Sequence, residues 1–194
     1  MTRRQQRENR PSLTSPWVLS TREVGRRPGN MRSYQRTIPA PASFGLEVIG
    51  IPEGSPIELE LRLESVTEGV FVSGSARAEV VGECARCLES IGYPLTVRFG
   101  ELFAYPDSVT EATTDADEIS RVIDDLVDIE EMVRDAVLLT LPLAPLCQED
   151  CQGLCPECGD RWADLDPAHS HETLDARWAG LRGRLTSDTD ATTE

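Results

Sequence analysis

The sequence predicts an α+β fold: a small antiparallel β-sheet packed by one long helix, with a C-terminal zinc-knuckle segment and an extended N-terminal arm. Apolar and polar residues alternate in short stretches before residue 100, which indicates half-buried strands. A later stretch has apolar residues at helical spacing, and six cysteines stand before and after it. A length of 194 residues fits one domain, expected over residues 41–185, between an arm of residues 1–40 and a disordered tail of residues 186–194.

The first 40 residues are strongly basic. Nine arginines against two glutamates give this segment a charge of +7, and because the whole chain carries −15, residues 41–194 carry −22. Prolines and glycines interrupt the segment, so we expect an extended arm that is partly disordered. An acidic body repels phosphate backbones, whereas a basic arm can neutralise them. The candidate RNA contacts are therefore Arg22, Arg26, Arg27 and Arg32. A tail without function is the alternative.

Three stretches have the pattern of β-strands. Residues 57–63 alternate strictly between apolar and charged side chains, residues 70–81 are rich in β-forming residues, and residues 93–99 alternate again. Such short spacing predicts an antiparallel sheet with one solvated face. The turn between the second and third strands carries Cys84 and Cys87.

An acidic stretch and a helix follow the predicted sheet. Residues 107–131 contain ten acidic residues and one arginine, which indicates a solvated loop or a docking surface for a basic partner. The clearest helix begins at Asp128, which can cap its N-terminus in a capping box with Glu131, and it ends at Pro142. Its apolar stripe should pack on the dry face of the sheet, with a partner-binding groove as the alternative. A last helix is expected over residues 174–185.

Eight soft donor side chains predict metal binding. They are Cys84, Cys87, Cys147, Cys151, Cys155, Cys158, His169 and His171. Thiolate and imidazole are the ligands that zinc prefers, and four of them around one ion form a closed, structural site. Two cysteines separated by two residues can direct both sulfurs at one ion because a short turn links them. The sequence therefore predicts one or two zinc ions.

These donors can be divided between sites in several ways. The favoured division places one zinc at Cys84, Cys87, Cys147 and Cys151, and a second at Cys155, Cys158, His169 and His171. A rival division joins both Cys-x2-Cys turns in one zinc ribbon and leaves Cys147 and Cys151 to the histidines. A third has one zinc ion and spare thiols. The histidines can also be solvated without binding metal.

Composition argues against most enzyme classes. The chain has no lysine, which excludes a P-loop lysine and a Schiff-base lysine. Its two histidines lie close together near the C-terminal end, so no histidine base is available elsewhere. We therefore expect no enzymatic activity and no small-molecule substrate. No stretch has the length of a signal-peptide core or a membrane span, so we expect a cytoplasmic protein whose reduced thiols bind metal.

Four motifs together resemble the YceD family of large ribosomal RNA subunit accumulation proteins. They are GECARCLE after alternating strands, ELFAYPD, IEEMVRDAVLLTLPLAPLC, and EDCQGLCPECG. The segment PWVLSTREVGRRPGNMR is similar to the leader of the actinobacterial branch of this family. The resemblance covers roughly residues 15–185.

The resemblance implies a non-enzymatic role in accumulation of 23S ribosomal RNA and in assembly of the large ribosomal subunit. The family pattern of Cys-x2-Cys plus two later donors maps onto Cys84, Cys87, Cys147 and Cys151, which favours the first division. Related Gram-positive sequences often carry Cys-x-Cys where this chain has His169 and His171. We expect the acidic body to bind a basic ribosomal protein and the arginine arm to contact ribosomal RNA or a pre-50S particle. A cysteine-based redox or zinc-availability sensor is the alternative.

Overall fold

The computed structural model describes residues 11–42, 44–115 and 119–171. The chain forms two compact units, Met1–Cys151 and Gln152–Glu194. Their boundary lies inside the segment for which the sequence analysis predicts a single domain. The helix expected over residues 174–185 and the tail of residues 186–194 lie outside the described residues.

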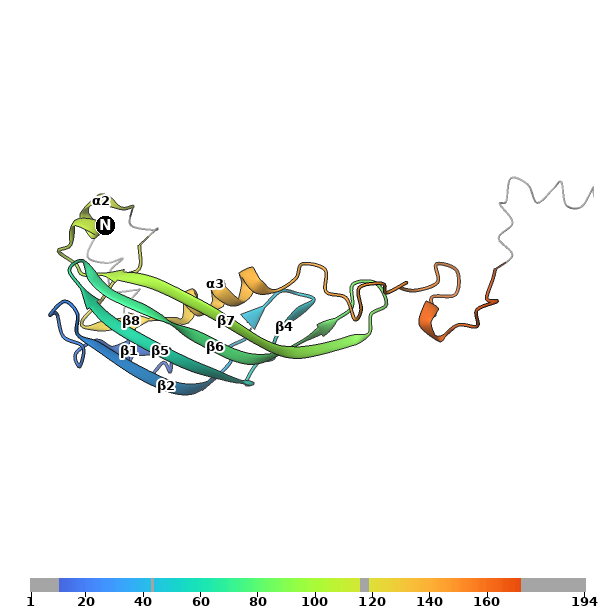
Figure 1. The fold of residues 1–194 in the computed structure, drawn as a ribbon, viewed down its shortest axis with the longest axis horizontal. Coiled ribbons are helices and arrows are strands. Elements are labelled where there is room, and N and C mark those ends of the chain that lie inside the picture. The colour runs from blue at the N-terminus through green and yellow to red at the C-terminus, as the bar shows by residue number, and fades with distance from the viewer. Residues whose placement is uncertain (1–10, 43, 116–118, 172–194) are drawn as a thin grey trace, which may run out of the picture. The chain divides into compact units, whose positions relative to one another are not determined.

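The first unit is built on a six-stranded antiparallel sheet (Figure 1). Four long strands follow one another in the order β2 (Met31–Pro39), β5 (Pro56–Val66), β6 (Gly69–Glu83) and β7 (Ser90–Ala104). A short hairpin of β3 (Phe44–Gly45) and β4 (Ile49–Ile51) also pairs with β6. The three strands predicted from the sequence pattern are confirmed as β5, β6 and β7, and each is longer than its pattern indicates.

Strand β5 shows how the alternation determines which face is buried. Its aliphatic side chains are at most 3% exposed and belong to the hydrophobic core; they are Ile57, Leu59, Leu61 and Leu63. The charged residues between them face solvent on the opposite side of the sheet. Each buried aliphatic side chain contributes about 1.5–3 kcal/mol relative to an exposed one. A shift of one residue would exchange the two faces, so this pattern specifies the register of the sheet.

Strands β6 and β7 form a long hairpin that positions the first pair of cysteines. Each strand has 15 residues, and β7 pairs with β6 along its whole length. Strand β5 pairs only with residues 69–77 of β6, and β4 pairs further along, at residues 81–82. At a rise of about 3.3 Å per residue, the ends of the hairpin are roughly 50 Å apart. The turn at the far end carries Cys84 and Cys87.

The N-terminal segment is folded, in contrast to the extended arm expected from its composition. Within residues 11–40, β1 (Val18–Ser20) pairs with β8 (Leu126–Asp128), and β2 forms an edge of the main sheet. Trp17 is 3% exposed and stacks on Phe44, with ring centroids 5.6 Å apart. The expectation was wrong for this part of the arm because burial of the short apolar run around Trp17 anchors it in the core despite its charge.

The helices are shorter than the single long helix expected. Helix α2 (Val109–Thr113) lies in the acidic stretch, and helix α3 (Glu130–Thr140) has 11 residues. Asp128 is the last residue of β8 and pairs with β1, so α3 begins after it. The Asp128 carboxylate nevertheless accepts a hydrogen bond from the Glu130 backbone N–H at 3.1 Å. Asp128 therefore accepts a hydrogen bond from the first turn of α3, although it lies two residues before the helix begins.

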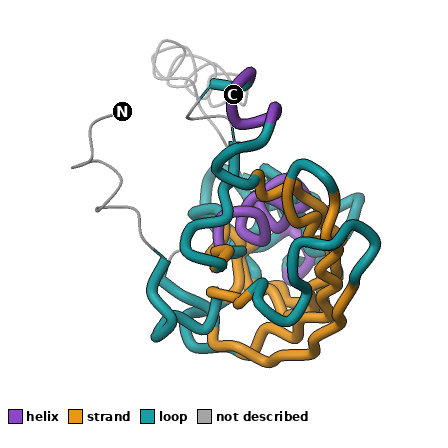
Figure 2. Tube along the Cα trace, turned by 90° about the vertical axis from the view of Figure 1, so that its left-hand side faces the viewer, coloured by secondary structure: helices purple, strands orange, loops and turns teal. Residues whose placement is uncertain are grey.

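Helix α3 packs its apolar stripe on the sheet as predicted. Met132, Val133 and Val137 are buried and belong to the same core as the aliphatic residues of β5. In the end-on view of Figure 2, the strands curl partly around this helix. Within the described part of the chain, no helix has the length and apolar character needed to cross a membrane.

The described part of the second unit, residues 152–171, has little regular structure. It contains a short 3-10 helix, η1 (Trp162–Asp164), and an isolated bridge between Leu154 and Arg161. None of these residues belongs to the hydrophobic core cluster.

Candidate metal centres

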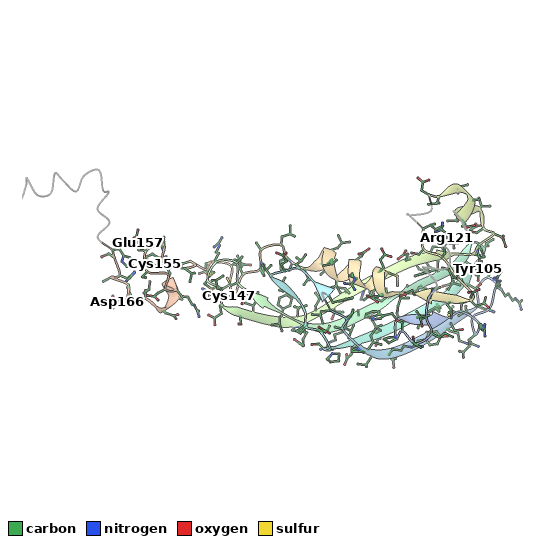
Figure 3. All side chains as sticks on the ribbon, turned by 180° about the vertical axis from the view of Figure 1, so that it is seen from behind. Tyr105, Arg121, Cys147, Cys155, Glu157 and Asp166 are labelled. Atoms are coloured by element: carbon green, nitrogen blue, oxygen red, sulfur yellow. The ribbon has the colours of Figure 1, made fainter. Side chains whose placement is uncertain are left out.

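The first group of donors joins the hairpin turn to the loop after α3. Cys84 and Cys87 lie in the turn between β6 and β7, and Cys147 and Cys151 follow the helix. Figure 3 labels Cys147. The Cys84 and Cys151 sulfurs are 3.7 Å apart, and those of Cys87 and Cys147 are 3.6 Å apart. All four sulfurs lie within 4.8 Å of one another. Zinc–sulfur bonds of about 2.3 Å in a tetrahedron separate the sulfurs by about 3.8 Å, so this spacing fits a zinc ion.

Backbone hydrogen bonds bring the two segments of this centre together. The Cys84 N–H donates to the Glu89 carbonyl at 2.8 Å, and the Leu88 N–H donates to the Cys84 carbonyl at 2.9 Å. Leu88 has a φ of 60°, a left-handed conformation that closes the turn at some steric cost. The Ala85 N–H donates to the Pro145 carbonyl at 2.8 Å, which attaches the loop after α3 to the turn. These backbone hydrogen bonds place the two pairs of cysteines side by side.

Arg86 makes a further contact between the two segments. It lies between the two cysteines of the turn, and its Nη1 donates to the Cys151 carbonyl at 2.8 Å. A hydrogen bond from a guanidinium is stronger than one between neutral groups. Arg86 is not among the site residues predicted from the sequence, although its place inside the Cys-x2-Cys turn is a signal. Arg86 adds a positive charge beside four sulfurs that become negative when they bind metal.

The sulfurs of the first centre differ in acidity. Burial raises the pKa of Cys84, but hydrogen bonds from backbone N–H groups, led by that of Cys147, outweigh it and lower the pKa to about 6. Desolvation and hydrogen bonds to neighbouring thiols raise the pKa of Cys147 to about 12. The first thiolate therefore forms readily, whereas four negative sulfurs together require a cation. Zn²⁺ supplies that charge.

The second group of donors lies within the second unit. It consists of Cys155, Cys158, His169 and His171, whose ligand atoms also lie within 4.8 Å of one another. The Cys158 sulfur is 3.6 Å from His169 Nε2. The backbone N–H of Cys158 lowers the pKa of Cys155 to about 6 against the effect of burial. Two thiolates and two neutral imidazoles balance the charge of Zn²⁺, whereas four thiolates leave the first centre at −2.

Local turns orient the donors of the second centre. Gly159, at a φ of 77°, donates its N–H to the Cys155 carbonyl at 2.8 Å and closes the turn after the second cysteine. A positive φ of this kind suits glycine. The His169 N–H donates to the Asp166 carbonyl at 2.8 Å. The Trp162 ring packs edge-on against the His169 ring at 5.6 Å.

The structure groups the donors as in the favoured division of the sequence analysis. Within the described residues, the groups of three or more metal-ligand side chains are these two sets of four. A zinc ribbon containing both Cys-x2-Cys turns does not match this grouping. Both sets have the donor types and the spacing that zinc requires.

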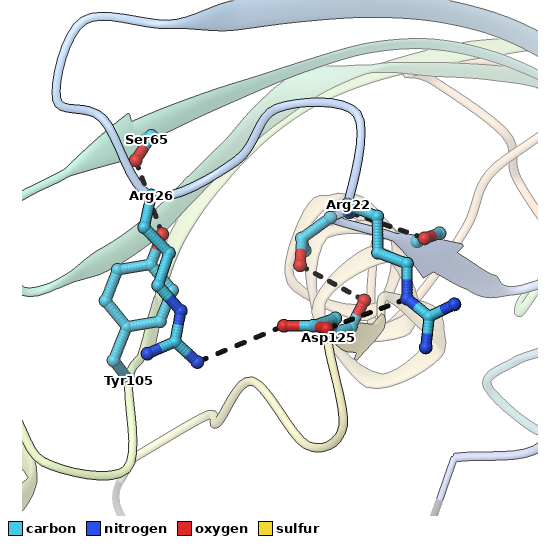
Figure 4. A network of polar contacts seen from close by, with 7 residues as sticks. Arg22, Arg26, Ser65, Tyr105 and Asp125 are labelled. Atoms are coloured by element: carbon cyan, nitrogen blue, oxygen red, sulfur yellow. Dashed lines mark hydrogen bonds and ion pairs between the residues drawn. The ribbon is translucent and has the colours of Figure 1, made fainter.

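The four arginines predicted to contact RNA lie on the surface of the first unit. They are Arg22, Arg26, Arg27 and Arg32, and all are exposed. Arg22 and Arg26 both approach the carboxylate of Asp125, and the Arg26 guanidinium lies over the Tyr105 ring at 4.9 Å (Figure 4). Figure 3 places Tyr105 near one end of the hairpin and Cys147 near the other. The arginine pair and the first metal centre therefore occupy opposite ends of the first unit.

Comparison with known proteins identifies the family. The sequence model described as "Large ribosomal RNA subunit accumulation protein YceD" matches residues 72–183, which include all eight donors. The chain belongs to the YceD family. This match begins after the arginine-rich segment, so the family model does not cover the four arginines.

Individual relatives extend the similarity to the N-terminal segment. An uncharacterized protein of Mycobacterium tuberculosis is 47% identical over 178 residues, covering 92% of this chain and 86% of the relative. One from Mycobacterium leprae is 42% identical over 194 residues, covering 100% of this chain and 89% of the relative. YlbN of Bacillus subtilis is 27% identical over 138 residues, which cover 71% of this chain and 78% of YlbN. The mycobacterial relatives agree with the expectation that this chain is of the actinobacterial type of the family. No solved structure matches this chain.

Proposed function

We propose that this YceD-family member is a non-enzymatic, cytoplasmic, zinc-binding factor that supports accumulation of 23S ribosomal RNA and assembly of the large ribosomal subunit. Family membership carries this proposal, because the family description names accumulation of the large-subunit RNA. The two sets of four donors support the zinc-binding part. Both sets are complete with protein ligands and leave no open coordination position, which favours a structural role over a catalytic one.

Zinc would cross-link the segments that carry the donors. The first centre would connect the hairpin turn to the loop after α3, through Cys84, Cys87, Cys147 and Cys151. The second would organise the described part of the second unit, through Cys155, Cys158, His169 and His171. When bound, the ions supply charge compensation and cross-links. The protein backbone and Arg86 position the sulfurs that receive them.

Opposite charges on the first unit favour two kinds of partner. Exposed carboxylates on the outer face of β5 and around the hairpin turn suit a basic ribosomal protein; they include Glu58, Glu60 and Glu83. The exposed arginines suit phosphates of ribosomal RNA or of a pre-50S particle. The factor would therefore present an acidic surface and a basic surface to different components of one assembly intermediate.

Depletion of the protein from growing cells tests this function. We expect less 23S ribosomal RNA and fewer large subunits in a sucrose gradient, with restoration by the wild-type chain. A chain with Cys84→Ser and Cys155→Ser should restore neither, because each replacement removes a donor. A matched chain with Ser90→Ala and Glu157→Gln, which changes two exposed side chains near the donors, should restore both. Unchanged 23S RNA and subunit levels after depletion would contradict the proposal, as would purified protein that contains no zinc.

Exposure of the second centre favours one alternative function. Three of the four donors of the first centre are buried and Cys147 is exposed, whereas in the second centre only Cys155 is buried and Cys158 and His171 are exposed. An exposed thiolate site can lose its metal on oxidation, which would make the protein a redox or zinc-availability sensor. Mild peroxide should then release zinc from the second centre first. Full retention of zinc under peroxide would exclude this alternative.

A further inference from the structure

Two arginines of the N-terminal segment share a single carboxylate. Arg22 Nε lies 3.6 Å from Asp125 Oδ2, and Arg26 Nη2 lies 3.9 Å from Asp125 Oδ1 (Figure 4). We infer that Arg22 and Arg26 form a clamp for a phosphodiester group, and that Asp125 occupies the position of this group until RNA binds. The inference rests on the proposed RNA-binding function and specifies where and how the RNA backbone is held.

The contacts to Asp125 are loose and accessible. Both distances exceed those of a direct hydrogen bond between nitrogen and oxygen. The side chains of Arg22, Arg26 and Asp125 are 75%, 63% and 44% exposed. Ion pairs exposed to this extent are weak. A phosphodiester also carries one negative charge on two oxygens, and guanidinium groups bind phosphate with short charge-assisted hydrogen bonds. Phosphate can therefore displace the carboxylate.

The backbone of Asp125 is held independently of its side chain. The Thr21 N–H donates to the Asp125 carbonyl at 2.9 Å, and the Thr21 hydroxyl donates to the same oxygen at 3.1 Å. Thr21 is buried, so these bonds are protected from water. Release of the carboxylate from the two arginines leaves this attachment intact. The clamp can therefore open without unfolding the N-terminal segment.

The aromatic ring of Tyr105 holds the guanidinium of Arg26 in place. Arg26 lies 4.9 Å from the centre of the Tyr105 ring, within the range of a cation–π contact. The Tyr105 hydroxyl lies 3.3 Å from the hydroxyl of Ser65, which is fully buried at the end of β5. This chain of contacts fixes the ring and therefore the guanidinium above it. A positioned arginine loses less conformational entropy when it binds phosphate.

The turn that carries Asp125 has an unusual backbone conformation. Asp124 and Asp125 have φ values of 54° and 60° in the tight turn between Ile123 and Leu126. Two consecutive left-handed residues usually include asparagine or glycine, because other side chains are strained there. Asparagine at position 125 would therefore suit the turn while removing the charge. This provides a variant that tests the carboxylate without disturbing the loop.

The clamp should recognise the RNA backbone and not the bases. Base recognition in single strands depends on exposed aromatic rings. The Tyr105 ring is covered on one face by Arg26, and among the described residues the exposed large hydrophobic side chains include one aromatic residue, Phe71. Phe71 belongs to β6, on the outer face of the sheet with Glu64 opposite. Binding should therefore depend on salt and not on base sequence.

Fluorescence anisotropy of the full-length, zinc-loaded chain with a short RNA duplex tests the clamp over a series of salt concentrations. Loss of the one clamped phosphate in Arg22→Gln/Arg26→Gln should make the slope of log K against log salt shallower by about 0.9. Arg77→Gln/Arg98→Gln removes the same charge from exposed positions in β6 and β7, and should leave the slope nearly unchanged.

Asp125→Asn should bind RNA about two- to fivefold more tightly, since it removes a weak competing ion pair. A duplex of scrambled sequence should bind equally well.

The outcomes separate the clamp from the wider proposal. Binding by the wild-type chain with equal slopes for the two double variants would overturn the clamp and leave the RNA-binding function intact. Weaker binding by Asp125→Asn would show that the carboxylate supports binding, which would also overturn the clamp. Absence of RNA binding by the wild-type chain would overturn both. Circular dichroism and thermal unfolding should show that all variants keep the wild-type fold.

Discussion

Replacement of Cys155 by serine should unfold residues 152–171 while the first unit stays folded. Among residues 152–171, Cys155 is the one buried residue that has a side chain, and no aliphatic side chain is buried there. Burial of even a large aliphatic side chain contributes only about 3 kcal/mol, whereas zinc binding to such sites contributes about 10–16 kcal/mol. Ordering the backbone costs about 1–2 kcal/mol per residue. Among the residues that the structure describes, no other interaction of this size stabilises this part of the chain.

Hydrogen exchange measured by mass spectrometry can follow the two units separately. In the zinc-loaded protein, the backbone amides of Cys155, Gly159 and Trp162 donate hydrogen bonds and should exchange slowly. Cys155→Ser, or a chelator, should make peptides from residues 152–171 exchange at the rate of an unfolded chain. Peptides from β5 should keep their protection, because that strand lies in the hydrophobic core.

A matched variant and a metal measurement make this test decisive. Glu157→Gln changes an exposed residue of the same turn and should keep wild-type exchange. Elemental analysis should show less zinc in Cys155→Ser than in the control. Slow exchange of residues 152–171 in protein that has lost the zinc of the second centre would refute the reasoning, because stability would then come from contacts other than the metal.

Three further outcomes test the first unit. Ile57→Ala should lower the free energy of unfolding in urea by about 2–5 kcal/mol, because the side chain is fully buried, whereas Val109→Ala at an exposed position should change it by less than about 0.5 kcal/mol. Arg86→Gln removes the guanidinium that donates to the Cys151 carbonyl, and should release zinc to a chelator faster than wild type. Burial and a nearby glutamate raise the pKa of Tyr34 above 10.0, so native stability should fall as pH rises through that pKa; Tyr34→Phe should remove this alkaline loss.

The strands of the core and the donors of the metal centres could be predicted because their signals are local. Alternation over residues 57–63 corresponds to burial on one face of β5, and apolar spacing after Asp128 corresponds to the buried face of α3. The pairs Cys84/Cys87 and Cys155/Cys158 each fit one turn. Spacing alone left the division between the two sites open, since it does not specify which distant segments meet.

The N-terminal segment shows where a local signal misleads. Its composition is that of a disordered arm, and nine arginines in 40 residues support that interpretation. In the structure, Trp17 is buried against Phe44, and β2 pairs with β5 over nine residues. Strand β2 lies at the sheet edge and is largely exposed, so its sequence lacks the alternation that marks β5. Partners distant in sequence supply the stability that its own composition does not.

The amino-acid sequence specifies the chemistry of this protein: thiols and imidazoles that suit zinc, an acidic body, a basic N-terminal segment, and strands with one apolar face. These properties belong to residue types and short spacings, so they can be recognised along the chain. Tertiary structure decides which residues that are distant in the sequence come into contact. The hydrogen bond from Ala85 to Pro145 brings residues 60 positions apart to one centre, and the contact of Arg22 with Asp125 spans more than 100 positions. Such contacts depend on how the whole core packs, because each is weak alone and forms only where the sheet and helix have already fixed the backbone.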